Sequence, residues 1–209
     1  MVFDDGGALG AQAALIRDLI EDTVDQANAT LPVEQSKFTV RSDASRTVPG
    51  YGIAGFALDI NDIEIVVDPL FPGLEQALRE RLPYVVAHEL HHIVRLRDPG
   101  IYQTLFDALI FEGMADHYAR DLTGAGLAPW SDAFPEADTD QYLVRAEPLF
   151  DSGFDFQAWF FGQGTDLPVW TGYTLGYRIL RDYYDARPDL SAADTVNAPA
   201  DDFRPGQTL

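Results

Sequence analysis

The 209-residue chain contains no cysteine and only one lysine, Lys37. Without cysteine it cannot form a disulfide, a thiolate zinc site or a cysteine nucleophile, so any metal must be held by histidine and carboxylate side chains. It also lacks any stretch of about 18 apolar residues, and no basic segment followed by an apolar run opens the chain. We therefore expect a cytoplasmic protein without a signal peptide or a membrane span.

Positive charge is scarce. The chain has 34 Asp and Glu residues against 14 Lys and Arg, which gives a net charge of -20. Phosphate binding needs a basic surface, so this balance argues against a nucleic-acid partner. The acids are spread along the whole chain, which is typical of a solubility device or an adaptation to salt, although an acidic surface could also attract basic peptides.

The chain has four histidines, all within one short segment: His88, His91, His92 and His117. Residues 84–95 read Tyr-Val-Val-Ala-His-Glu-Leu-His-His-Ile-Val-Arg and contain the pattern His-Glu-x-x-His. Each helical residue turns about 100°, so His88 and His92 share one face. His91 also lies one turn from His88, at the i, i+3 spacing, but choosing it as a ligand would abandon the usual relation of Glu89 to the pair, so we expect it on a second face. Two imidazoles at this spacing can hold zinc, and Glu89 can take a proton from metal-bound water. The apolar neighbours indicate a buried helix, whose charge needs a partner such as a metal.

A catalytic zinc ion usually takes three protein ligands and keeps one position for water. Without cysteine, the third ligand must be histidine or carboxylate. Glu112 is the best candidate, because it lies in an otherwise apolar stretch where an unpaired carboxylate would be costly to bury. Gly113 would let another helix or the metal approach closely. Asp116, one turn later, could accept the outer N–H of a ligand histidine; the alternative is an ordinary exposed acid.

The remaining pattern predicts an α+β fold with a small, mostly antiparallel sheet packed on the motif helix. Helices are expected over residues 9–31, 74–79, 83–96, 104–122, 140–150, 154–161 and 172–186. Strands are expected over residues 37–42, 52–59 and 63–67, the last two as a hairpin. The predicted organisation is one domain over residues 1–198, with an α+β part over 1–124 and a helical part over 125–198, followed by a flexible tail over 199–209.

Three segments carry a resemblance to known metallopeptidases: Ala-His-Glu-Leu-His-His, Glu-Gly-Met-Ala-Asp-His-Tyr-Ala and Gly-Tyr-Thr-Leu-Gly-Tyr. The chain resembles the gluzincins, the thermolysin-like clan, whose third ligand is a glutamate on the following helix. It is more similar still to a bacterial family of predicted zinc-dependent proteases, catalogued mainly as a domain of unknown function. The resemblance covers residues 50–198. Its first two segments are specific together, and the third is weak alone.

The resemblance implies a minimal zincin-like domain with one Zn²⁺ per chain. The implied ligands are His88, His92 and Glu112. Glu89 would be the general base, and Asp116 would hold a ligand histidine by a hydrogen bond. This set agrees with the one reached from the residues alone.

The resemblance also implies that a strand within residues 52–67 offers its edge to an extended peptide. Larger gluzincins have a second domain as the far wall of the cleft, and here only residues 125–198 could form it, which leaves substrate length and proteolytic competence open. Amide cleavage further requires an oxyanion stabiliser. The candidates are Tyr173 and Tyr177, with His117 in reserve; tyrosines at helical spacing are, however, more often core aromatics.

The sequence therefore predicts a zinc metallopeptidase acting on a peptide or protein substrate, with Glu89 as the base. Two alternatives stay open. One is a weak or inactive zincin-fold module that binds peptides around a structural zinc, and the other is a hydrolase of non-peptide amides. Glu89 favours an enzyme, because a structural zinc site needs no base.

Overall fold

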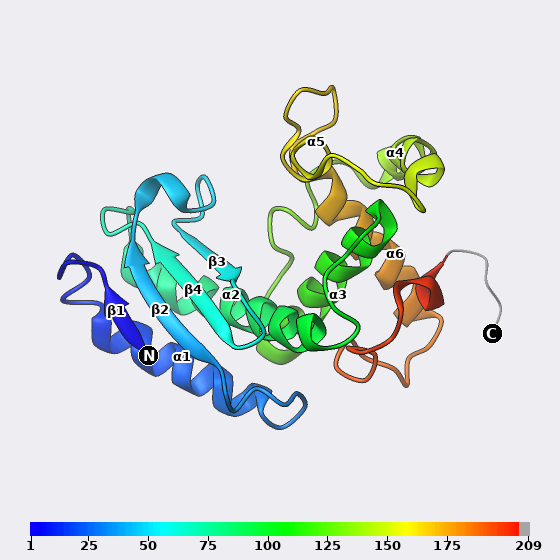
Figure 1. Ribbon diagram of the computed structural model, residues 1–209. Coiled ribbons are helices and arrows are strands. Elements are labelled where there is room, and N and C mark those ends of the chain that lie inside the picture. Colours follow the sequence, from blue (N-terminus) through cyan, green and yellow to red (C-terminus); the bar gives the residue numbers. More distant parts are fainter. Residues whose placement is uncertain (205–209) are drawn as a thin grey trace. The chain divides into compact units, whose positions relative to one another are not determined.

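The structure, a computed structural model, describes residues 1–204 (Figure 1). The described chain divides into two compact units. Unit 1 comprises Met1–Asp98 and Tyr118–Ala125, and unit 2 comprises Pro99–His117 and the chain from Gly126 onward. Helix α3 (Leu105–Thr123) therefore supplies residues to both units.

Unit 1 contains a four-stranded sheet in the order β1-β2-β4-β3. Its strands are β1 (Val2–Asp4), β2 (Lys37–Ser42), β3 (Ile53–Ala57) and β4 (Asp62–Val67). β1 runs parallel to β2 and β2 parallel to β4, whereas β3 and β4 form an antiparallel hairpin. The sheet is mostly parallel, so the prediction of a mostly antiparallel sheet is wrong. Two features account for this. β4 rather than β3 pairs with β2, in parallel over six residues, so the hairpin adds only its outer strand in the antiparallel sense. β1, whose three residues are too few to show a pattern in the sequence, adds a second parallel pair.

Two long helices accompany the sheet of unit 1. α1 (Ala13–Ala27) packs against α2 (Leu74–Arg97), and α2 packs against β3 and β4 (Figure 1). Most strand residues on the face toward α2 are apolar, and six of them are buried: Phe38, Val40, Ile53, Ile63, Ile65 and Val67. On the opposite face the buried Glu64 forms ion pairs with Arg41 and Arg46.

α2 is one unbroken helix, although the sequence predicts two helices divided before Pro83. A proline inside a helix lacks the N–H of its own hydrogen bond and costs about 3 kcal/mol. Leu78, Leu82 and Val86, on both sides of the proline, are fully buried. Burying such side chains contributes about 1.5–3 kcal/mol each, which outweighs the lost bond and keeps the helix continuous.

Unit 2 is helical. After α3 come η2 (Glu136–Asp138), α4 (Thr139–Ala146), η3 (Glu147–Leu149), α5 (Phe156–Phe161), α6 (Thr171–Asp185) and η4 (Ala200–Phe203). The predicted helices of this region are present with shifted ends. The sequence predicts a flexible tail over residues 199–209, but η4 forms within it and Phe203 is buried against Tyr183. Residues 205–209 of the predicted tail lie outside the described part of the chain.

α3 and α6 cross with their backbones in direct contact. A Cβ atom on Gly176 would lie 2.0 Å from the carbonyl oxygen of Leu109, and one on Gly113 would lie 2.4 Å from the carbonyl carbon of Gly176. No side chain fits between the two helices here. The expectation that Gly113 lets another helix approach closely is confirmed, and the approaching helix is α6.

Candidate metal centre

His88 and His92 occupy successive turns of α2 in unit 1. Their rings meet edge to face, with centroids 4.4 Å apart and planes at 85°. Their exposed fractions are 6% and 5%, so both imidazoles are withdrawn from water. The buried helix inferred from the apolar neighbours is thus present, and it places both rings on one face.

Glu89 is also buried and lies against β3, one of the two edge strands of the sheet. Its side chain occupies the space directly above Gly55, where any β-carbon would collide with it. The carboxylate is thus confined between its own helix and the strand backbone.

His91 lies on a different face of α2 and is fully buried. Its ring packs on the ring of Tyr118, with centroids 5.6 Å apart. The hydroxyl of Tyr118 shares a hydrogen bond with that of Thr30 at 3.2 Å. This surrounding is that of a packed histidine, in line with the expectation that His91 is not the second imidazole of the pair.

Glu112 lies on α3, in the part of the helix that belongs to unit 2, and has an exposed fraction of 6%. Asp116, one turn later, is completely buried, which excludes the alternative of an ordinary exposed acid. Its carboxylate accepts hydrogen bonds from Trp130 Nε1 at 3.0 Å and Ser131 Oγ at 2.7 Å. A carboxylate has room for further donors, so the predicted bond from a ligand histidine stays a prediction.

His88, His92 and Glu112 form a cluster that could hold a metal ion. One ligand atom from each of the three buried residues lies within 4.8 Å of the others. Two imidazole nitrogens and one carboxylate oxygen are a donor set found in catalytic zinc sites. The residue types fit zinc, and an ion there would compensate the charge of a buried carboxylate.

The predicted oxyanion candidates lie in aromatic surroundings in unit 2. Tyr177 stacks on His117 with ring centroids 4.2 Å apart and planes within 3°, and the His117 Nε2 atom is hydrogen-bonded to the Tyr177 carbonyl at 2.9 Å. Tyr173 meets Phe160 edge to face at 5.0 Å and is half-buried. All three rings contribute to packing, and their predicted catalytic role stays a prediction.

Tyr102 is a further residue near the acid, and the sequence does not single it out. It precedes α3, and its ring packs against those of Phe111 and Phe156. Burial, followed by the negative charge of Glu112, raises the pKa of Tyr102 to about 12. The phenol therefore keeps its proton. Tyr102 stands in an irregular segment without periodicity, so its position ten residues before Glu112 is the one hint that the sequence offers.

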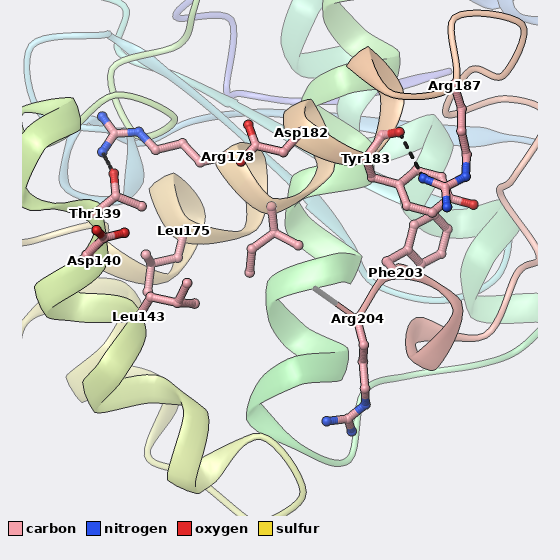
Figure 2. A pocket seen from close by; sticks show the side chains of 11 residues that line it. Thr139, Asp140, Leu143, Leu175, Arg178, Asp182, Tyr183, Arg187, Phe203 and Arg204 are labelled. Atoms are coloured by element: carbon pink, nitrogen blue, oxygen red, sulfur yellow. Dashed lines mark hydrogen bonds between the residues drawn. The ribbon is translucent and has the colours of Figure 1, made fainter. Parts of the chain in front are cut away.

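A separate cavity of about 320 Å³ lies in unit 2, and none of the predicted site residues lines it (Figure 2). Its wall combines apolar side chains from α4 and α6 with arginines. The guanidinium of Arg187 covers the ring of Tyr183 at 4.0 Å, and Arg178 is bound to Thr139 Oγ1 at 2.7 Å. This cavity is distinct from the cluster of histidines and glutamate.

The chain is similar over part of its length to a known protein. The chain is 32% identical over 119 residues to an uncharacterized protein, YjfC, of Bacillus subtilis (strain 168). The aligned part makes up 49% of this chain and 40% of that protein, so the chain spans less than half the length of this relative. No solved structure matches the chain.

A family model gives a broader match. Residues 65–204, more than half of the chain, match the model of a family described as "Predicted Zn-dependent protease (DUF2268)". The matched region contains α2 with His88 and His92 and α3 with Glu112. The chain belongs to this family of predicted zinc-dependent proteases.

Proposed function

We propose that the protein is a zinc-dependent peptidase that hydrolyses peptide bonds. The observation that carries the proposal is the cluster of His88, His92 and Glu112, which brings three buried ligand atoms within 4.8 Å of one another. Glu89 supports an enzyme in particular, because it is buried one residue after a ligand histidine and a structural site has no use for a base. The family description points to the same class.

The two histidines and Glu112 would hold one zinc ion. When bound, the metal would polarise the scissile carbonyl and lower the pKa of the attacking water. Glu89 takes a proton from that water as its oxygen bonds to the carbonyl carbon, and delivers the proton to the amine nitrogen when the C–N bond breaks. Asp116 would orient a ligand histidine, while Tyr102, Tyr173, Tyr177 and His117 are the candidates for stabilising the oxyanion.

The hairpin supports binding of an extended peptide beside Glu89. In the described sheet β3 is the last strand, so its outer edge pairs with no other described strand. At one end of the hairpin the Asp68 N–H donates to the Gly52 carbonyl at 3.0 Å. At the other end the Leu58 N–H donates to the Asp62 carbonyl at 2.8 Å.

Bonded and non-bonded residues alternate along an antiparallel pair. Ile53, Gly55 and Ala57 are therefore the residues whose backbone groups point away from β4, and the Ile53 carbonyl does accept a bond on that side, from the Val48 N–H at 3.3 Å. Gly55 and Ala57 keep outward N–H and C=O groups. We infer that an extended substrate segment adds to this edge through main-chain hydrogen bonds.

The decisive experiment compares the wild type with Glu89→Gln on fluorescent casein and on a mixed peptide library. The amide keeps the shape of the side chain but cannot act as a base, so we expect bound zinc and unfolding midpoint to stay unchanged while turnover falls by about a hundredfold or more. Glu75→Gln, at an exposed acid in the first turn of the same helix, is the matched control and should keep full activity.

Equal cleavage by the wild type and Glu89→Gln would exclude Glu89 as the base. If the zinc-loaded wild type cleaves neither substrate, the peptidase assignment fails and the peptide-binding module is favoured instead. Hydrolysis of small amides without cleavage of peptides would favour the non-peptide amide hydrolase.

A further inference from the structure

The contact between β3 and α2 leaves no room for a side chain at position 55. A Cβ atom on Gly55 would lie 2.5 Å from Glu89 Cγ and 2.8 Å from Glu89 Oε1. It would also lie 2.8 Å from Cγ1 of Val85, one turn earlier on α2. The strand backbone thus forms the surface on which the Glu89 side chain rests.

A glycine at this place is not explained by backbone conformation. The φ angle of Gly55 lies outside the left-handed region, unlike those of Gly50 and Gly52 in the preceding turn. Glycine also weakens a strand, because it loses more entropy on folding and adds no packing. The requirement must therefore come from the space above it, and Glu89 and Val85 fill that space.

We propose that Gly55 is a positioning residue for the base, holding the Glu89 carboxylate at its working place by leaving the strand surface bare. The inference rests on the proposed peptidase function. A β-carbon at position 55 would have to displace Glu89 by about 1 Å to reach an ordinary carbon–carbon contact of about 3.5 Å. Misplacement of that size can cost about a hundredfold in rate.

The outward backbone groups of Gly55 give this position a second consequence. Gly55, which supports the Glu89 side chain, would also pair with the substrate main chain. This one residue would therefore set the distance between the Glu89 carboxylate and the bound peptide. A side chain at position 55 would leave the outward N–H and C=O in place. The effect of adding one is therefore expected in kcat rather than in KM.

The test is Gly55→Ala, with Gly126→Ala as the control, because a Cβ on Gly126 meets nothing within 4 Å and its φ is ordinary. We expect Gly55→Ala to bind one equivalent of zinc and to keep its KM on a cleaved library peptide, while kcat falls about a hundredfold. Wild-type kcat in zinc-loaded Gly55→Ala, or a loss that appears only in KM, would overturn the proposal.

A second measurement needs no catalysis. Urea unfolding of the wild type, Gly55→Ala, Glu89→Ala and the double variant forms a cycle that reports the contact itself. Truncating Glu89 removes its Cγ and Oε1 atoms, so Gly55→Ala should cost clearly less stability in the Glu89→Ala background. An equal cost in both backgrounds, or failure of Gly55→Ala to fold in both, would show that Glu89 does not fill the space. If the wild type cleaves no substrate, the proposed peptidase function is refuted, but the cycle still tests whether Glu89 fills the space above Gly55.

Discussion

Replacement of Asp116 by alanine should destabilise the protein strongly. The carboxylate is fully buried and accepts hydrogen bonds from Trp130 Nε1 and Ser131 Oγ. The Trp130 carbonyl in turn accepts a bond from Thr174 Oγ1 on α6 at 2.8 Å, so the acid supports a segment held between α3 and α6 of unit 2. Alanine would leave the indole N–H and the serine hydroxyl buried without their acceptor.

The size of the effect follows from those two bonds. Hydrogen bonds to a charged group contribute about 1.5–3 kcal/mol each, which sets a range of about 3–6 kcal/mol for both. Removing a buried carboxylate also relieves its desolvation, so we expect a loss near the lower end, about 3 kcal/mol. Asp116→Asn should lose only about 1 kcal/mol, because the amide oxygen can accept from Trp130 and the Ser131 hydroxyl can accept from the amide N–H.

Urea unfolding followed by tryptophan fluorescence measures both variants, with the exposed Asp140→Ala as control. A loss below about 0.5 kcal/mol for Asp116→Ala would refute the reasoning, since such a value is typical of an unimportant surface site. Chelator competition on Asp116→Asn then tests whether Asp116 also accepts a hydrogen bond from a ligand histidine. If Asp116 also holds a ligand histidine, zinc should bind about ten- to a hundredfold more weakly than in the wild type.

Three further outcomes are expected. Glu112→Ala should purify with far less than one equivalent of zinc by elemental analysis, and unchanged zinc affinity would remove Glu112 from the site. The pKa of Glu64 lies below its ordinary value, because burial acts to raise it but hydrogen bonds and charges from Arg46 and Arg41 outweigh burial. Its stabilising contribution is therefore present above about pH 4.5 and lost as the pH falls through the lowered pKa, so urea midpoints of Glu64→Gln should depend less on acid pH than those of the wild type. Gly176→Ala should cost about 3 kcal/mol or more in urea unfolding by forcing α3 and α6 apart, whereas Gly153→Ala, with open space around its Cα, should cost little.

The local relations within the candidate site can be predicted from the sequence. His88, Glu89 and His92 share one helix, so their relation depends only on helical spacing, and the burial of that helix can be read from its neighbours. Glu112 stands out because an isolated acid in an apolar stretch is costly. Predicting these residues requires no knowledge of the fold.

Features that depend on tertiary contacts escape sequence reasoning. The mostly parallel sheet arises because β2 pairs with β4 rather than with β3 and because β1, too short to show a pattern, adds a second parallel pair. The continuity of α2 through Pro83 depends on burial on both sides of the proline. In the sequence Gly55 is only a residue that weakens a strand, and its contact with Glu89 becomes evident only in the structure. The pKa of Tyr102 is raised by burial and then by the charge of Glu112, and the sequence shows neither of these surroundings.

The short strand β1 has a practical consequence for handling the protein. β1 is an edge strand and pairs with β2. Residues 2–4 therefore cover the outer edge of β2, a six-residue strand that carries the buried Phe38 and Val40. An uncovered edge of this kind is a template for pairing with another chain. Trimming the first residues, or fusing a partner close to them, would therefore favour self-association, and light scattering of a protein shortened by residues 1–4 would reveal it.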